Sequence, residues 1–295
     1  MEYTINDGVT QSLLCSFIHC RQMCQNILDG WEFESPKRAL QFGKLVHGLL
    51  ENHYTQEEVD GEAYFRDWQK KCIADGDDVQ AVEKDIAIAK ALVDNYVPYW
   101  QKQDSKRTWI ELEGVFDVPW NGFRLRGRTD GIYRTGTGGI WLFETKTASQ
   151  IQDEQMEQRL SFDFQNLFYL TAKAQELGCR IRGVMYNVIR KPLLRQKKQE
   201  SDADYWQRCA DDVASRPDHY YHRFEVVYTK AKQEWFQGEL LAKLNDFKTW
   251  LQGGAPTYRN QNACVGRWAC NYLKMCAEGT DGYSKSKELF GELKD

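Results

Sequence analysis

Apolar residues in the first third of the chain recur at the spacing of a helix. Between residues 36 and 54 they occupy positions 42, 45, 46, 49 and 50, which lie on one side of a helix. A longer amphipathic stretch covers residues 79–100. We therefore expect residues 10–103 to be mainly helical.

After residue 103 the pattern changes to the alternation of apolar and polar residues that is typical of strands. The expected strands cover residues 109–118, 123–134, 139–147, 181–190 and 223–229, and the expected helices cover residues 161–177 and 230–251. Strands interrupted by helices predict an α/β core, in which a mixed sheet has helices on both sides.

Length and composition fit one elaborated domain. The chain has 295 residues, of which 42% are hydrophobic and 13% aromatic, so it can bury a sizeable core. It contains no internal repeat and no low-complexity linker. We expect one domain over residues 1–279, made of the helical region 10–103, a core at 104–251 and a C-terminal cysteine segment. A polar tail at 280–295 follows.

Candidate chemistry lies on neighbouring expected strands. Glu144 and Lys146 are two residues apart and therefore point to the same face of their strand. The turn-rich residues 135–138 join this strand to the preceding one, so Asp130 can lie beside them in a hairpin. Carboxylates suit Mg²⁺ or Mn²⁺, and an ammonium group can stabilise charge on an attacked phosphate. For Glu144 and Lys146 alone the alternative is a surface ion pair. Glu113, in the first expected strand, could be a further acidic residue lining the site, but we favour its interpretation as a solvated strand residue.

Two helices supply further candidates. His47 lies at the edge of the apolar face of its helix, one turn after Gly43, and a neutral imidazole can bind a metal ion. Gln165 and Tyr169 are four residues apart on the helix after the Glu144 strand, so both can position a phosphate or a water. The alternatives are a half-buried histidine with a hydrogen-bond partner and an ordinary amphipathic helix.

The order of these residues resembles the PD-(D/E)XK nuclease superfamily. It is more closely similar to the RecB-type branch, which includes CRISPR-associated four-cysteine nucleases and related phage exonucleases. The segments that carry the resemblance are 42–47, 127–131, 143–147 and 164–169. The metal ligands that it implies are His47, Asp130, Glu144 and the Thr145 carbonyl. By the same resemblance Lys146 serves the attacking nucleophile, and Gln165 and Tyr169 complete the site.

Cysteines form a second constellation. The chain has nine, and Cys264, Cys270 and Cys276 recur at six-residue intervals. We expect a cytoplasmic protein, because the first residues lack a basic and then apolar signal region and no apolar run approaches the ~20 residues that cross a bilayer. Disulfides are rare inside cells, so clustered cysteines indicate zinc or an iron–sulfur cluster. The candidates for a fourth thiolate are Cys15, Cys20 and Cys24.

The resemblance to the RecB-type branch implies a 4Fe–4S cluster with one cysteine from the N-terminal region and three from the C-terminal end. By that resemblance its ligands are Cys20, Cys264, Cys270 and Cys276. Cys24 is the next candidate after Cys20, and zinc is the alternative to the cluster. Joining the two ends of a long loop in this way stabilises a fold.

Charge adds less to the picture. The net charge of −4 does not indicate a general nucleic-acid binder. Local basic groups exist, because Arg124, Arg126 and Arg128 share the strand face of Asp130 and a basic run covers residues 190–198.

Together the motifs predict a metal-dependent DNA nuclease, an exonuclease that acts on single strands or duplex ends. DNA is the expected partner, recombination or repair proteins are candidate partners, and no membrane is expected. The alternatives are a DNA-binding scaffold without cleavage and a zinc protein that is not a nuclease.

Overall fold

Strands from along the whole chain assemble into two sheets. The computed structural model describes residues 3–33, 38–55, 61–151, 153–265, 270–285, 289–290 and 293. Its strands are β1 (Val9–Thr10), β2 (Trp31–Phe33), β3 (Arg107–Trp120), β4 (Phe123–Thr135), β5 (Ile140–Ala148), β6 (Ile181–Arg190), β7 (Tyr221–Val227) and β8 (Tyr283–Lys285). In the described part of the chain, β2 and β8 form a two-stranded sheet and the other six strands form one mixed sheet.

The mixed sheet has both antiparallel and parallel neighbours. Strand β4 is antiparallel to β3 and β5, β5 is parallel to β6, and β6 is antiparallel to β7. The β3–β4 hairpin turns at Asn121 and Gly122, both of which have positive φ, as the tight turns favoured in hairpins require. The parallel pair β5–β6 needs a crossover, and two helices supply it.

Strands β4 and β5 part at Asp130. Their pairing runs from Arg134 with Ile140 to Gly131 with Phe143. After Phe143, β5 continues beside β6 alone. The short β1 pairs with an earlier part of β4, at Leu125 and Arg126. The fork leaves Asp130 without a partner on β5 and Glu144 without a partner on β4.

Helices surround this sheet. Those of six or more residues are α1 (Gln11–His19), α2 (Arg21–Leu28), α3 (Arg38–Thr55), α4 (Gly61–Ala74), α5 (Val79–Asp104), α6 (Asp153–Leu160), α7 (Phe164–Leu177), α8 (Asp202–Ser215), α10 (Lys230–Leu251) and α12 (Leu273–Glu278). The shorter ones are η1 (Ile5–Asp7), α9 (Pro217–Tyr220) and α11 (Gln261–Cys264). Side-chain caps begin several of them: Thr10 accepts from the Leu13 N–H and Asp163 from the Asn166 N–H.

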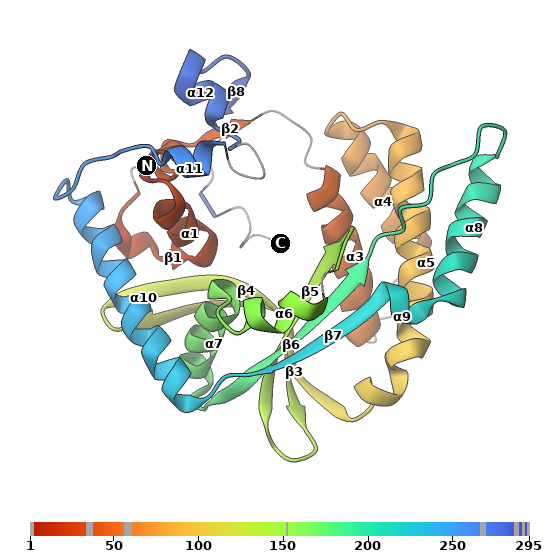
Figure 1. Ribbon diagram of the computed structural model, residues 1–295, viewed down its shortest axis with the longest axis horizontal. Helices are drawn as coiled ribbons and strands as arrows, with labels where there is room; N and C mark the ends of the chain where they lie inside the picture. Colours follow the sequence, from red (N-terminus) through yellow and green to blue (C-terminus); the bar gives the residue numbers. More distant parts are fainter. Residues whose placement is uncertain are drawn as a thin grey trace.

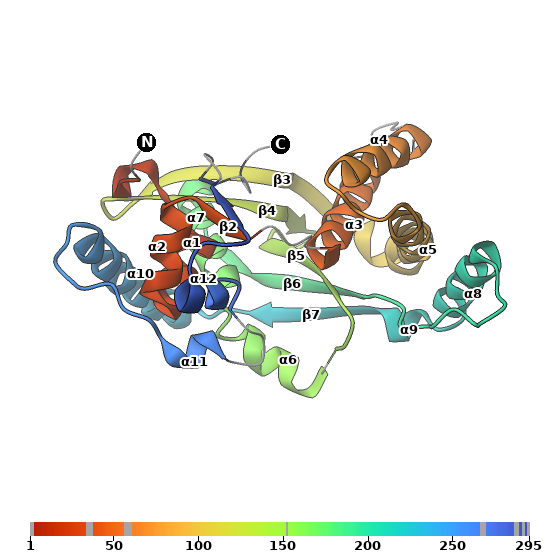
Figure 2. The same ribbon diagram turned by 90° about the horizontal axis from the view of Figure 1, so that it is seen from above.

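The helices form two groups over different parts of the sheet. Helices α1, α7 and α10 pack against one another and share a core with β3, β4 and β6. Helices α3, α5 and α8 form the second group, with its own buried cluster. Figure 1 shows the first group on the left and the second on the right, and Figure 2 shows the same separation from above.

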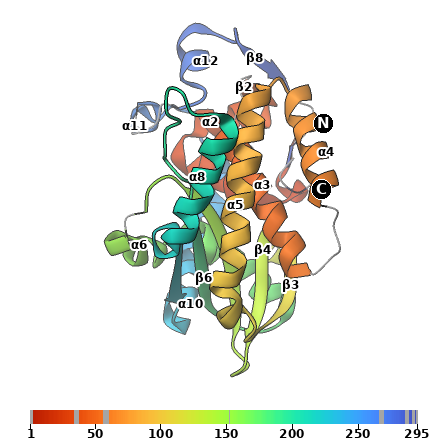
Figure 3. The same ribbon diagram turned by 90° about the vertical axis from the view of Figure 1, so that its right-hand side faces the viewer.

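The C-terminal segment returns to the N-terminal region. Strand β8 pairs with β2, and the Tyr272 hydroxyl donates to the Trp31 carbonyl at 2.7 Å. Tyr283, within the predicted polar tail, is buried, and its hydroxyl donates to the Asn271 carbonyl. Figure 3 shows α11, α12 and β8 gathered beside β2, away from most of the sheet. The first part of the expected tail is therefore an ordered strand.

The predicted α/β architecture is confirmed: a mixed sheet is flanked by helices. The strand predicted at residues 181–190 and the helix at 230–251 have the predicted bounds. Helix α3 begins at Arg38, and residues 36 and 37 of the prediction lie outside the described ranges. In those ranges no helix is both long and apolar enough to cross a membrane.

Candidate active site

The fork between β4 and β5 brings the two predicted strand motifs together. The backbone N–H of Thr145 donates to Asp130 Oδ2 at 2.6 Å. This bond replaces the ladder bond that β5 would make if it stayed paired with β4. The Asp130 carboxylate is therefore held against the Glu-x-Lys strand, as the predicted hairpin requires.

Glu144 forms the buried centre of the site. Its side chain is 1% exposed, and its Oε1 accepts from Lys146 Nζ at 2.6 Å and from Gln165 Nε2 at 2.9 Å. Its other oxygen, Oε2, is buried and has no hydrogen-bond partner among the residues that the structure describes. A buried carboxylate oxygen without a donor is costly unless a further group satisfies it.

Lys146 and Tyr169 complete this side of the fork. The Lys146 side chain is 39% exposed, so its ammonium group can reach both Glu144 and a molecule from solvent. Tyr169 lies four residues after Gln165 on α7. Its ring packs edge-on against the Phe116 ring, with 5.7 Å between the ring centroids. The predicted amide of Gln165 thus contacts Glu144 on β5, and burial together with the nearby Glu144 charge raises the pKa of the Tyr169 hydroxyl.

His47 approaches the fork from the second helical group. Its Nδ1 lies 3.5 Å from Asp130 Oδ1 and 3.7 Å from Glu113 Oε1. Helix α3 runs close to β5 at Gly43, because a Cβ there would lie in van der Waals contact with Thr147 Oγ1, at 3.4 Å.

Glu113 corrects the sequence interpretation. It was expected to be solvated, but it is partly buried and faces His47. Its φ is +45°, a left-handed conformation that is strained for glutamate and frequent at functional sites. Within the described residues, His47, Glu113 and Asp130 are the one set of three histidine, cysteine or carboxylate ligand atoms lying within 4.8 Å of one another. The pairs Leu112–Gly131 and Gly114–Thr129 bring Glu113 level with Asp130 across β3 and β4, a register that the sequence does not show.

The charges at the fork are strongly coupled. Burial alone would lower the pKa of His47, but the Asp130 and Glu113 carboxylates outweigh it and raise that pKa to about 10. Burial and the nearby Asp130 raise the pKa of Glu144 to about 7, against the opposing charge of Lys146. Burial would raise the pKa of Asp130, but the positive charges of His47 and Lys146 outweigh burial, so this pKa is lowered. The cluster therefore carries excess negative charge that protons partly neutralise.

A buried polar network lies behind Thr145. Asn187 Nδ2 donates to Thr145 Oγ1 at 3.2 Å, and Arg223 Nε donates to Asn187 Oδ1 at 3.3 Å. Arg223 is in turn paired with Asp104, at 2.6 Å, and donates to the Tyr96 hydroxyl. The network links the β5 strand to helix α5 and so limits movement of the fork.

A small cavity opens beside the triad. It is lined by residues that include His47, Glu113, Asp130 and Thr145, and its volume is about 10 Å³. This is close to the smallest volume that holds one water or ion-sized ligand. The arrangement thus offers space next to its oxygen and nitrogen ligands.

The four predicted cysteine ligands gather outside this fork. The pKa of the Cys270 thiol is raised by burial and also by the neighbouring thiols of Cys264, Cys20 and Cys276, so all four share one region. Their spacing is looser than that of the histidine–carboxylate triad, because no three of the sulfur atoms lie within 4.8 Å of one another.

Backbone and amide donors point at these sulfur atoms. The Asn260 N–H donates to Cys20 Sγ and the Tyr272 N–H to Cys270 Sγ, each at 3.4 Å, and Asn26 Nδ2 lies 4.0 Å from Cys276 Sγ. Such donors stabilise thiolates.

The other two candidate cysteines have different surroundings. Cys24 is fully buried in the main core, and its thiol lies 4.0 Å from the Leu13 carbonyl. The Cys15 thiol accepts from Gln11 Nε2 at 3.1 Å. These surroundings favour Cys20 as the partner of the C-terminal thiols.

Three of the basic residues noted in the sequence are paired with acidic ones. Arg124 and Arg126 both contact Asp117. Lys191, from the run at 190–198, pairs with Asp85 at 2.7 Å. These groups therefore contribute less free positive charge than the sequence indicated.

Comparison with known proteins finds a matching family and similar solved structures. A family model described as the PD-(D/E)XK nuclease superfamily matches residues 10–277. A crystal structure named "Putative exonuclease" from Eubacterium rectale covers 92% of this chain and 94% of that chain, with a TM-score of 0.52 and 11% sequence identity, and shares the fold. The crystal structure of SSO0001 covers 58% of this chain and 84% of that chain, with a TM-score of 0.24 and 16% identity. No curated protein matches the chain.

Proposed function

The chain belongs to the PD-(D/E)XK nuclease superfamily, and we propose that it is a DNA nuclease whose catalytic site is the fork between β4 and β5. The observation that carries the proposal is the meeting of Asp130, Glu144 and Lys146 with His47, which comes from a distant helix. Within the superfamily we assign the chain to the RecB-type branch, on the four ordered motifs. We propose that it acts as an exonuclease on single strands or duplex ends, in keeping with the name of the Eubacterium rectale protein.

The residues at the fork fit a hard divalent cation. Glu144 Oε2 is buried without a donor, and Nδ1 of His47 faces two carboxylates with a small cavity beside them. We propose His47, Asp130, Glu144 and the Thr145 carbonyl as ligands, and we add Glu113. Oxygen-rich sets with one imidazole suit Mg²⁺ or Mn²⁺. When bound, such an ion supplies Lewis acidity toward the phosphate and lowers the pKa of an attacking water.

The chain's own groups then position the reactants. Lys146, held 2.6 Å from Glu144 and partly exposed, donates to the attacking water and stabilises negative charge that develops on the phosphate. Gln165 holds Glu144 Oε1, which fixes the carboxylate orientation. We propose that Tyr169, one turn further on α7, contacts the substrate phosphate.

Metal binding should release protons. At pH 7 the His47 imidazole, with its pKa of about 10, is protonated, and Glu144, with its pKa of about 7, is half protonated. Because ligands must be deprotonated, each bound Mn²⁺ should displace between about one and two protons, and Mn²⁺ affinity should rise from pH 6 to pH 9. Titration calorimetry in buffers of different ionisation enthalpy measures the number of protons released for each Mn²⁺ that binds.

The control for this titration is His47→Gln, which should lower the number of released protons by about one. An affinity for Mn²⁺ that is constant over the same pH range would contradict the assignment of these ligands.

We also propose a structural 4Fe–4S cluster held by Cys20, Cys264, Cys270 and Cys276. Support comes from their shared neighbourhood and from the N–H groups that donate to two of the sulfur atoms. Such a cluster would connect α1 to the C-terminal segment and so close a loop of most of the chain, which stabilises the folded state.

Protein purified without oxygen should contain iron and labile sulfide. Cys20→Ala should lose both and lower the melting temperature, because one ligand to the cluster is gone. Cys24→Ala is the matched control, since its thiol lies in the core, and it should keep the iron. Zinc in place of iron, or iron retained by Cys20→Ala and lost by Cys24→Ala, would contradict this ligand set.

The nuclease proposal itself is tested with purified protein and end-labelled DNA. Single strands, blunt duplexes and closed circles are incubated with Mg²⁺ or Mn²⁺. We expect shortening of the linear forms from their ends and survival of the circles. Wild-type protein that leaves every form intact with both ions would refute the proposal.

A further inference from the structure

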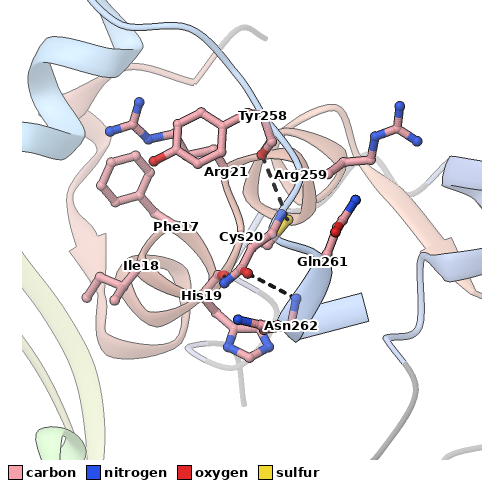
Figure 4. Close-up of a pocket in the computed structure, with 10 residues that line it drawn as sticks. Phe17, Ile18, His19, Cys20, Arg21, Tyr258, Arg259, Gln261 and Asn262 are labelled. Atoms are coloured by element: carbon pink, nitrogen blue, oxygen red, sulfur yellow. Dashed lines mark hydrogen bonds between the residues drawn. The ribbon is translucent and has the colours of Figure 1, made fainter. Parts of the chain in front are cut away.

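An open pocket of about 420 Å³ lies between the end of α1 and residues 258–262. Figure 4 shows its lining side chains, with Cys20 at the base and the side chains of Arg21 and Arg259 on opposite sides. The volume is within the range of small-ligand sites. The pocket is separate from the fork, since the two share no lining residue.

The lining of this pocket is positive in a chain that is acidic overall. None of its ten lining residues is acidic, and they include Arg21, Arg259 and His19. The whole chain has 43 acidic residues and a net charge of −4. A pocket lined by arginines and by no carboxylate, in a chain with more acidic than basic residues, is suited to an anion.

Aromatic and amide groups accompany the charge. The Tyr258 side chain is exposed, with 54% of the residue accessible. The Arg21 guanidinium lies 4.7 Å from the Tyr258 ring centroid and 5.3 Å from the Phe17 ring centroid. Asn262 adds an exposed amide. Ring faces beside guanidinium groups stack and charge-pair with nucleotides.

The pocket wall is held in place by the cysteine region. Asn260 donates its N–H to Cys20 Sγ at 3.4 Å and its side-chain amide to the His19 carbonyl at 2.8 Å. Arg259 donates to the Cys276 carbonyl at 3.1 Å, and Arg21 to the Pro256 carbonyl at 3.1 Å. The charged groups are therefore oriented before any ligand arrives, which reduces the entropy cost of binding.

We propose that this pocket binds one nucleotide of a single-stranded DNA, with the base on Tyr258 and the flanking phosphates at Arg21 and Arg259. The inference rests on the proposed nuclease function and assigns that enzyme a second contact with its substrate. Stacking on the Tyr258 ring accepts any base, so binding is expected to tolerate any sequence.

The pocket is within reach of a strand that also occupies the fork. Thr10 pairs with Arg126, four residues before Asp130 on β4, and α1 begins directly after Thr10. Four residues of strand span about 13 Å and the nine residues of α1 about 14 Å, so the pocket lies within roughly 30 Å of Asp130. A single strand of several nucleotides covers this distance.

The test measures binding apart from cleavage. A fluorescein-labelled oligo-dT of about 20 nucleotides is titrated with full-length protein carrying Lys146→Ala, so that the strand stays intact. Adding Tyr258→Ala should weaken binding about tenfold, because one stacked base is lost. The matched control is Trp235→Ala, which removes another exposed ring, 59% accessible, on α10, and it should bind like the parent.

The charge is tested in the same assay. Arg259→Gln should reduce the slope of log affinity against log salt by about 0.7, the value for one phosphate contact on a single strand. Arg66→Gln, which removes an exposed arginine on α4, should leave the slope unchanged.

Each outcome separates the two proposals. Equal affinities of Tyr258→Ala and Trp235→Ala would overturn the pocket assignment even if the wild type cleaves DNA. Weaker binding by Tyr258→Ala alone would support it even if the wild type does not cleave. Tyr258-dependent binding of dTMP as tight as that of the oligonucleotide would overturn the strand assignment in favour of a free nucleotide.

Discussion

Replacing Lys146 with alanine is expected to reduce DNA cleavage by about 10²- to 10³-fold. The ammonium group is the one cation in direct contact with Glu144 that is also partly exposed among the described residues. Removing a preorganised donor to the transition state costs an enzyme this much, whereas substrate binding in the ground state changes little. The measurement is the initial cleavage rate on an end-labelled strand at saturating Mg²⁺, together with the affinity for the same strand.

The matched control is Lys230→Ala, which removes a lysine that is 78% exposed at the start of α10 and should leave the rate unchanged. Thermal melting shows whether Lys146→Ala is still folded. A folded Lys146→Ala protein that cleaves at the wild-type rate would exclude the fork as the catalytic site. In that case the chain's DNA-binding role, without cleavage at this position, becomes the better description.

Replacing Asp130 with asparagine is expected to weaken Mn²⁺ binding by about 100-fold. Asp130 contributes both to the triad with His47 and Glu113 and to the fork, where it accepts the Thr145 N–H. The substitution removes one negative charge from the set and can also misalign β5. Loss of groups that only orient ligands already costs about 10- to 100-fold in affinity, so loss of a direct ligand should lie at or above the upper limit.

Glu113→Gln tests the residue that the sequence did not assign to the site. It keeps the size of the side chain, so a loss of about tenfold in Mn²⁺ affinity would reflect the missing charge. Glu62→Gln, on the exposed surface of α4, is the control. Mn²⁺ affinity is measured by calorimetry or from the electron paramagnetic resonance signal of free Mn²⁺. Neither measurement depends on cleavage. Unchanged affinity in both Asp130→Asn and Glu113→Gln would place the ion elsewhere.

The two sites give the molecule a division of tasks. The fork provides carboxylates, an imidazole and a lysine, which suit hydrolysis of a phosphodiester. The pocket beside α1 provides guanidinium groups and an exposed ring, which suit binding without chemistry. The pocket is formed by elements from opposite ends of the chain, the end of α1 and residues 258–262. On our two proposals, the segment containing the cysteines would therefore affect both how the substrate is held and how stable the fold is.

The elements with strong periodicity were predictable because their signals are local. Strand β6 alternates buried and exposed residues early in its length, and α7 has a side-chain cap at Asp163 and an αL glycine, Gly178, at its end. The Glu144–Lys146 contact also follows from local geometry, because residues two apart share a strand face.

Short strands and long-range neighbours were not predictable in this way. Strand β1 has two residues and β2 and β8 have three each, too few for a periodic signal. They form because a partner strand, distant in the sequence, supplies their hydrogen bonds. The ordered Tyr283 in the expected tail has the same cause.

From sequence alone follow the α/β class, the positions of the main helices and strands, and the residue types that can bind a metal ion and a phosphate, since each depends on spacing along a few turns or strand repeats. Folding decided the rest: the parting of β4 from β5, the turning of Glu113 toward His47, and the neighbourhood of Cys20 and Cys270. These depend on strand register and on packing between segments that lie 250 residues apart, such as those of Asn26 and Cys276. No local pattern encodes such distances, because they are set by the combined packing of the whole core.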